Sequence, residues 1–148
     1  MDTTLDAPAA RAASTAHRCD VLIADDTGPS RELLASIIRN FAGRLEIREA
    51  RNGSDALTLW QELLPRITLL DIDMPGLDGI SALKRIREAE PTAFVAMISG
   101  VSSIDHVREA LSHGASGFVI KPYKPQRILD LLERYKQLSG HDLLKARA

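Results

Sequence analysis

Five short apolar runs recur along this chain, and they constrain its fold more than any other feature. We expect them to be strands over residues 21–24, 45–50, 67–70, 93–98 and 117–120. Four of the runs are apolar almost throughout, which is typical of parallel strands buried on both faces. The run 45–50, LEIREA, alternates apolar with charged residues, so we place it at an edge of the sheet. The chain is therefore predicted to fold around one parallel sheet.

Helical periodicity separates these runs. Apolar stripes at helical spacing lie near residues 33–41, 56–64, 80–86, 104–111 and 128–138. Pro29 and Pro125 suit the first turns of the first and fifth helices, and Ser54 is the expected N-cap of the second. Pro91 and Gly114 are expected to end the third and fourth. Strands that alternate with helices predict an α/β domain of five βα units over residues 18–138.

Composition and chain ends narrow the class of protein. Residues 1–17 are rich in Ala, Thr and Ser without a period, which predicts a flexible tail, and residues 139–148 form a short C-terminal tail with no output domain. The balance of 19 basic against 20 acidic side chains argues against direct nucleic-acid binding. No apolar stretch is long enough for a membrane span, and the lone Cys19 is expected in the core. These features favour a cytoplasmic protein.

Polar side chains follow four of the runs at the point where each strand is expected to end. Asp25 and Asp26 follow the first run, Asp71 the third, Ser99 the fourth and Lys121 the fifth. Because the carboxyl ends of parallel strands meet at one edge of a sheet, these side chains are expected to converge. Carboxylates suit a divalent cation, and a hydroxyl with an ammonium suits phosphoryl oxygens. The sequence therefore predicts a site for a cation beside a phosphoryl group.

The same residues carry a family resemblance. The pair Asp25-Asp26, the segment LLDIDMPGLDG around Asp71, MISG with Ser99 and GFVIKP with Lys121 resemble the receiver domain of bacterial two-component response regulators. The match follows the family's order and spacing over residues 19–138. It implies a flavodoxin-like, doubly wound sheet of five parallel strands in the order 2-1-3-4-5 with five helices, as in a stand-alone chemotaxis receiver.

The resemblance implies a phosphoacceptor chemistry. Asp71 would accept a phosphoryl group from a sensor histidine kinase or a phosphotransfer protein. Mg²⁺ or Mn²⁺ would be held by Asp25, Asp26 and Asp71, together with the backbone carbonyl of Asp73. The Asp73 carboxylate is expected to tune the rate of dephosphorylation. The protein would not be an enzyme beyond its own phosphorylation and dephosphorylation.

The resemblance also implies a switch. Ser99 and Lys121 would contact phosphoryl oxygens, Pro122 would follow a cis peptide bond, and Phe118 would be the aromatic residue that rotates inward. The surface that changes would combine the fourth helix, fifth strand and fifth helix, near His106, Arg108, Tyr123, Lys124 and Arg127. A downstream protein would bind there, and homodimerisation on the same surface is an open alternative. Contact with nucleic acid or a membrane is not expected.

The chain departs from the family pattern at a few positions, and two alternative functions remain. Phe118 lacks the hydroxyl of the common Tyr, and Ser99 replaces the common Thr. One alternative is a receiver fold that acts as an interaction module without phosphorylation. The other is a phosphohydrolase similar to the haloacid dehalogenases, suggested by Asp71 and Asp73 with the downstream Ser99 and Lys121. Those enzymes keep their acidic pair after the lysine, whereas here it precedes Lys121.

Overall fold

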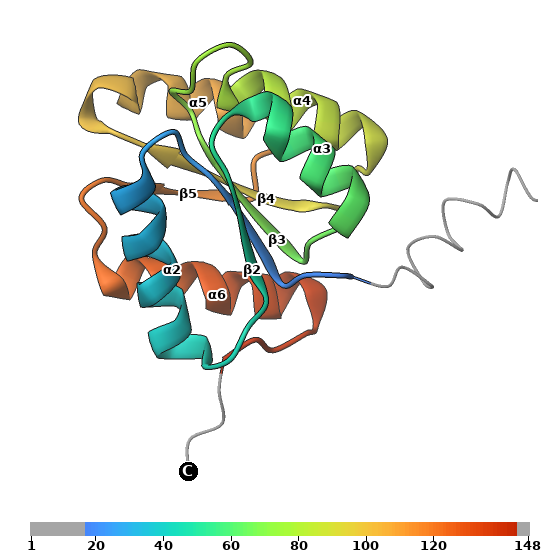
Figure 1. Ribbon diagram of the computed structural model, residues 1–148, viewed down its shortest axis with the longest axis vertical. Coiled ribbons are helices and arrows are strands. Elements are labelled where there is room, and N and C mark those ends of the chain that lie inside the picture. The colour runs from blue at the N-terminus through green and yellow to red at the C-terminus, as the bar shows by residue number, and fades with distance from the viewer. Residues whose placement is uncertain (1–16, 145–148) are drawn as a thin grey trace, which may run out of the picture.

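A computed structural model describes residues 17–144 of the chain (Figure 1). The flexible tail expected over residues 1–17 lies outside the described residues except for His17, and residues 145–148 of the expected C-terminal tail lie outside them as well. Within the described part, no helix combines the length and the apolar character needed to cross a bilayer.

Five parallel strands form one sheet. Their order is β2-β1-β3-β4-β5, which confirms the predicted topology. The strand β2 pairs only with β1 and lies at the sheet edge, as the alternating run predicts. The strands are β1 (Val21–Ala24), β2 (Ile47–Ala50), β3 (Ile67–Asp71), β4 (Phe94–Ser99) and β5 (Gly117–Ile120).

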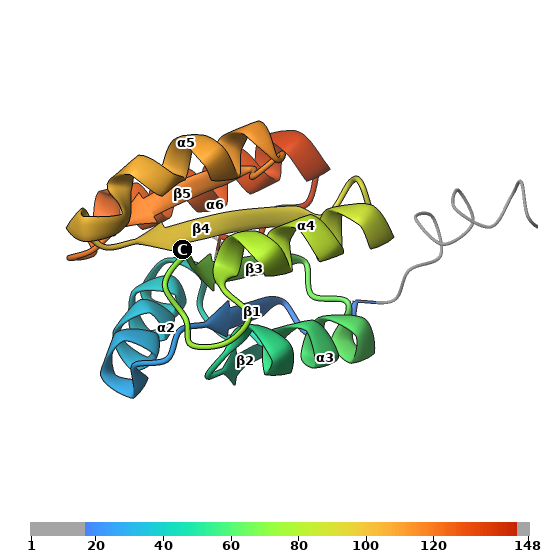
Figure 2. The same cartoon turned by 90° about the horizontal axis from the view of Figure 1, so that it is seen from above.

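Within residues 17–144, five helices cover the two faces of the sheet, so the domain has three layers. Helices α2 and α6 lie on one face, and α3, α4 and α5 lie on the other (Figures 1 and 2). A short 3₁₀ turn, η1 (Val101–Ser103), leads from β4 into α5. The helices are α2 (Gly28–Ala42), α3 (Gly53–Leu63), α4 (Gly79–Ala89), α5 (Ile104–Ser112) and α6 (Pro125–Ser139).

Successive residues of each inner strand enter two different cores, because side chains alternate across a strand. Val21 and Ile23 of β1 pack with α2 and α6, whereas Leu22 and Ala24 pack with the helices of the opposite face. Burial on both faces is the reason that the inner runs are apolar throughout. The lone cysteine, Cys19, is buried just before β1, as expected.

Some boundaries differ from those expected. Strand β2 begins at Ile47 and not at residue 45. The Glu46 carbonyl still accepts the Val21 N–H of β1, but the Glu46 N–H donates to the Asp20 side chain. Ser54 is not the N-cap of α3: Asn52 is, and its side chain accepts the Asp55 N–H at 2.7 Å. Beyond the expected end of the domain, Leu143 is buried in the core beneath α2 and α6.

Candidate functional site

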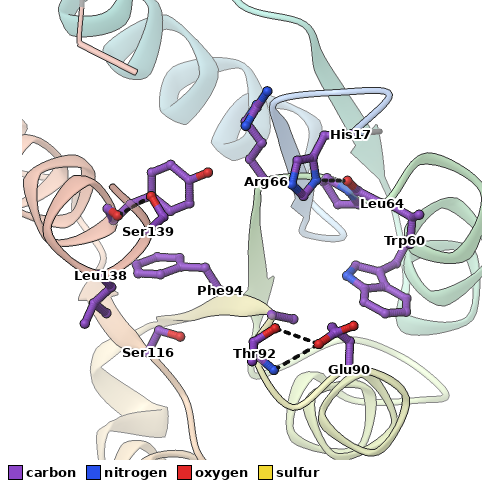
Figure 3. A pocket seen from close by; sticks show the side chains of 13 residues that line it. His17, Trp60, Leu64, Arg66, Glu90, Thr92, Phe94, Ser116, Leu138 and Ser139 are labelled. Carbon is purple, nitrogen blue, oxygen red and sulfur yellow. Dashed lines mark hydrogen bonds between the residues drawn. The ribbon is translucent and has the colours of Figure 1, made fainter. Parts of the chain in front are cut away.

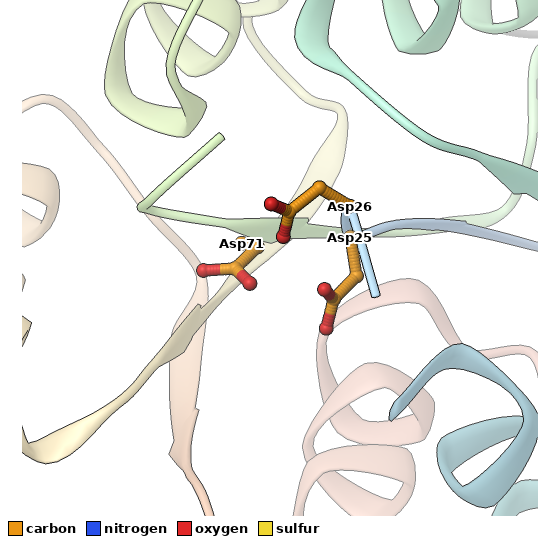
Figure 4. A group of neighbouring side chains, drawn as sticks. All are labelled: Asp25, Asp26 and Asp71. Carbon is orange, nitrogen blue, oxygen red and sulfur yellow. The ribbon is translucent and has the colours of Figure 1, made fainter. Parts of the chain in front are cut away.

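The carboxyl edge of the sheet brings together the side chains that the sequence singles out. Asp25 follows β1 directly, Asp71 and Ser99 are the last residues of β3 and β4, and Lys121 follows β5. Asp25, Asp26 and Asp71 each offer a carboxylate oxygen, and these oxygens all lie within 4.8 Å of one another (Figure 4). The predicted convergence is therefore present, and we call these three carboxylates the acidic cluster.

The backbone around Asp25 fixes the first carboxylate of the acidic cluster. Its Oδ1 accepts the Thr27 N–H at 2.9 Å, and its carbonyl oxygen accepts the Arg31 guanidinium at 2.6 Å. Asp25 is fully buried, whereas the neighbouring Asp26 is exposed. The acidic cluster is thus anchored in the core and open to solvent on the Asp26 side.

Asp71 is buried at the end of β3 with both carboxylate oxygens engaged. Oδ1 accepts the Asp73 N–H at 3.0 Å, and Oδ2 accepts the Lys121 ammonium at 2.9 Å. The following peptide is also held, because the Ile72 N–H donates to the Ile98 carbonyl of β4. The Asp71 side chain is therefore held by its own loop and by the lysine after β5, while β4 fixes the backbone that follows it.

Lys121 brings a cation to the acidic cluster. Its Nζ lies 2.9 Å from Oδ2 of Asp71 and 2.9 Å from Oδ2 of Asp25. The Lys121 N–H donates to the Ser99 carbonyl at 2.8 Å, which ties the lysine to the end of β4. Three carboxylates and one ammonium leave the cluster with an excess of two negative charges.

Burial and charge act in opposite directions on these groups. For Asp25, burial raises the pKa, but the Lys121 ammonium and the Thr27 N–H outweigh it, so the pKa lies below its ordinary value. For Asp71, burial dominates over the same ammonium, and the pKa is raised. Burial lowers the pKa of Lys121, but the two carboxylates raise it by more than that. The pKa of Lys121 therefore lies above its ordinary value, and the lysine stays charged. Burial therefore disfavours the charged form of Asp71, whereas the charged form of Asp25 is favoured.

The acidic cluster fits a divalent cation. Asp25 Oδ2 is buried, and its one contact among the described residues is the ion pair with the Lys121 ammonium at 2.9 Å, which leaves a second lone pair of this oxygen free. An open acceptor position, an oxygen-only donor set and two excess negative charges are what a hard cation such as Mg²⁺ requires. Asp25, Asp26 and Asp71 could hold it, and the Asp73 carbonyl stays a prediction.

Ser99 lies at the same edge, but its hydroxyl points elsewhere. The side chain is fully buried, and its Oγ donates to the Gly100 carbonyl at 2.8 Å. Ser103, which sequence reasoning missed, is buried as well, and its Oγ donates to Oδ2 of Asp73. No sequence pattern marks this contact, since the segment VSS looks like an ordinary loop.

The predicted switch residues lie on the side of β5. Phe118 is 44% exposed, and the Lys121–Pro122 peptide bond is cis, as expected. An open groove of about 870 Å³ runs between α5, β5 and α6 past Phe118. Of the residues expected on this surface, Tyr123 is half-buried, with its OH 2.9 Å from Ser30 Oγ, and four are exposed: His106, Arg108, Lys124 and Arg127.

A smaller hollow of about 230 Å³ lies at the opposite edge of the sheet (Figure 3). Trp60, Phe94 and Tyr135 contribute aromatic walls, and the His17 ring lies at its rim with Nδ1 2.6 Å from the Leu64 carbonyl. None of the predicted site residues lines it. The hollow is therefore separate from the predicted site at the carboxyl edge.

Comparisons with known proteins agree with this geometry. The chain is 38% identical over 114 residues to the chemotaxis protein CheY of Thermotoga maritima, covering 77% of this chain and 94% of that protein. It is 34% identical over 120 residues to CheY of Bacillus subtilis, covering 80% and 97%. The crystal structure of the receiver domain of NtrX from Brucella abortus superimposes with a TM-score of 0.75 at 35% identity, covering 81% and 100%. Residues 21–133 match the model of the response regulator receiver domain, and the chain belongs to that family.

Proposed function

We propose that this receiver accepts a phosphoryl group on Asp71 from the phosphohistidine of a sensor kinase or phosphotransfer protein, with Mg²⁺ or Mn²⁺ held by the acidic cluster. One observation carries the proposal. The Lys121 ammonium contacts Asp71, the carboxylate whose pKa is raised, at the edge where Asp25 and Asp26 supply further oxygens. A cation, an ammonium and a nucleophilic carboxylate in one place are the parts that phosphoryl transfer needs.

The transfer step follows from these contacts. An Asp71 carboxylate oxygen forms a bond to phosphorus as the phosphorus–nitrogen bond of the phosphohistidine breaks, and the electron pair of that bond stays on the imidazole nitrogen. Lys121 offsets negative charge on the transferred group, and a bound divalent cation would supply further charge neutralisation. Attack of water on the acyl phosphate then releases phosphate and restores the carboxylate. The chemistry is confined to the protein's own phosphorylation and dephosphorylation.

The signal would pass from the site to the groove between α5, β5 and α6. Ser99 Oγ donates to the Gly100 carbonyl, so it must give up that bond to reach a phosphoryl oxygen. Phe118 is three residues before Lys121 on the same segment, and its ring is half exposed. Movement of the Ser99 loop would open space for this ring, and a downstream protein would bind the altered surface. We expect this exchange in the cytoplasm.

Intact-mass spectrometry tests the phosphoacceptor. The protein is incubated with acetyl phosphate and Mg²⁺, and the wild type should gain the mass of one phosphoryl group. Asp71→Asn should gain none, and chelation of Mg²⁺ should abolish the gain on the wild type. Asp105→Asn, which alters an exposed carboxylate on α5, is the matched control and should behave as the wild type.

Three outcomes would count against the proposal. A folded wild type that gains no phosphoryl group would leave the interaction module without phosphorylation as the better account. A gain on both the wild type and Asp71→Asn would move the acceptor to another residue. Turnover of small phosphate monoesters would favour the phosphohydrolase. Such an enzyme needs an acidic residue after Lys121 at its site, but Asp130 lies on α6 and contacts Arg127 and Gln126.

A further inference from the structure

Ser103 joins two loops at the carboxyl edge of the sheet. It ends the 3₁₀ turn after β4, its side chain is buried, and its hydroxyl donates to Oδ2 of Asp73, thirty residues away. The Asp73 side chain is exposed on its other sides. A hydrogen bond to a carboxylate is stronger than one between neutral groups, so this contact can fix the direction of an otherwise free side chain.

The backbone and the side chain of Asp73 therefore contact different groups. Its N–H donates to Oδ1 of Asp71, so its backbone lies at the acidic cluster. Its carboxylate is directed to Ser103 and is not one of the three carboxylates whose oxygens lie within 4.8 Å of one another. A fourth carboxylate is thus carried to the edge of the cluster but held outside it.

Ser103 is itself anchored to the loop that carries Ser99. The Ser103 N–H donates to the Gly100 carbonyl at 3.1 Å, and the same carbonyl accepts the Ser99 hydroxyl at 2.8 Å. The backbone hydrogen bond therefore fixes the position of Ser103, so its hydroxyl can restrain the Asp73 side chain.

We propose that Ser103 is a positioning residue that keeps the Asp73 carboxylate out of the acidic cluster. The inference rests on the proposed function in that the cluster binds a divalent cation. Without the Ser103 hydroxyl, the Asp73 carboxylate is free to turn toward the cation, which gains a fourth carboxylate and binds more tightly. The added negative charge repels an anionic phosphodonor, so phosphorylation becomes slower.

Calorimetric titration with Mg²⁺ tests this restraint on the whole chain. Ser103→Ala should lower the Kd for Mg²⁺ by about threefold or more, within the range of coupling found for directly contacting residues. Ser103→Cys keeps the shape of the side chain with a somewhat larger atom but offers only a weak donor, and it should act in the same direction. Ser102→Ala is the matched control, because Ser102 lies in the same turn, is exposed, and forms no side-chain hydrogen bond within residues 17–144. It should bind as the wild type does.

The Asp73→Asn background separates a direct restraint from general disturbance of the loop. There, Ser103→Ala should no longer change the Kd, since the carboxylate that it releases is gone. An effect of equal size in both backgrounds would refute the restraint, and so would a wild-type Kd in both Ser103 variants. If the wild type itself binds no Mg²⁺, the cation site of the proposed function fails instead. Urea unfolding of each variant verifies that the compared proteins are folded.

Discussion

The Lys121 ammonium lies 2.9 Å from Oδ2 of Asp71 and 2.9 Å from Oδ2 of Asp25, so one cation after β5 holds together carboxylates from β1 and β3. Both carboxylates are buried, whereas the lysine side chain is 28% exposed. The carboxylates of Asp25 and Asp71 have oxygens within 4.8 Å of each other, so their negative charges repel, and burial strengthens the repulsion. The lysine therefore makes the acidic cluster compatible with a folded domain in the absence of a divalent cation.

Replacement of Lys121 should reveal this dependence. Lys121→Met keeps much of the apolar stem but leaves two buried carboxylates without their cation, and it should lower the free energy of unfolding at pH 7 by about 2 kcal/mol. Because the pKa of Lys121 is raised by its partners, the wild-type contribution is fully present at pH 7 and is lost only as the pH rises through that raised value. Urea unfolding measures the difference.

Lys124→Met is the control for this substitution, because Lys124 is exposed and forms no ion pair within the described part of the chain. It should leave the free energy of unfolding nearly unchanged. Added Mg²⁺ should restore part of the stability of Lys121→Met, since the cation replaces the missing positive charge. Equal stability of Lys121→Met and the wild type at pH 7 would show that the carboxylates do not need the ammonium.

Asp71→Asn should stabilise the protein while it removes the proposed acceptor. Burial raises the pKa of Asp71, which means that its ionised form favours the unfolded chain. At neutral pH the variant should be more stable by about 1 kcal/mol, as is common for single stabilising substitutions. Below the ordinary Asp pKa of 3.8 the carboxyl is neutral in both states, so the advantage disappears there. It grows as the pH rises above 3.8 and is complete above the raised value.

Thermal or urea unfolding between pH 3 and pH 8 measures the two profiles. Asp105→Asn is again the matched control, and its profile should follow that of the wild type. A lower stability of Asp71→Asn at pH 7 would mean that the contact with Lys121 outweighs the cost of burial. In that case the raised direction of the Asp71 pKa would be wrong.

Gly79 controls how closely α4 approaches the acceptor strand. A Cβ at Gly79 would lie 2.1 Å from the Asp71 carbonyl oxygen and 2.8 Å from its carbon, and these backbone atoms cannot rotate away. Gly79→Ala should therefore cost about 2 kcal/mol of stability and slow the phosphorylation of Asp71. Gly28→Ala is the control, because its Cβ would meet only the Arg31 guanidinium at an ordinary 3.7 Å. Phosphorylation of Gly79→Ala at the wild-type rate would show that the approach is not needed.

The sequence predicted the sheet and the meeting of the site residues because both depend on local apolar runs. The run 67–70 is buried on both faces, so its strand and its place inside the sheet could be predicted without any contact information. Asp71 and Ser99 turned out to be the last residues of their strands and not the first residues after them. That shift of one residue leaves them at the same edge.

Contacts between loops could not be predicted in the same way. Ser54 and Asn52 are both suitable N-caps, and only the backbone of the turn decides that Asn52 accepts the Asp55 N–H. The Ser103 contact with Asp73 spans thirty residues and depends on the 3₁₀ turn after β4. No apolar periodicity in the sequence predicts that turn. Leu143 is buried although it follows the last helix, because the chain turns back at Gly140 against the core.

Phe118 should become buried when the site is loaded. In the described state Phe118 is 44% exposed beside the groove between α5, β5 and α6, and exposure of an aromatic side chain costs free energy that an inward rotamer would recover. The protein contains only two other phenylalanines, Phe41 and Phe94, so incorporation of fluorophenylalanine gives three fluorine resonances. Mg²⁺ with beryllofluoride, which stands in for the phosphoryl group, should shift the Phe118 resonance and reduce the solvent exposure of this side chain.

The other two phenylalanines are internal controls. Phe94 is buried in the core and Phe41 is half-buried on α2, so the resonances of both should stay nearly unchanged. Phe118→Leu assigns the resonance, and Asp71→Asn should show no shift. If beryllofluoride binds and the Phe118 ring keeps its exposure, the signal leaves the site by a route other than this side chain.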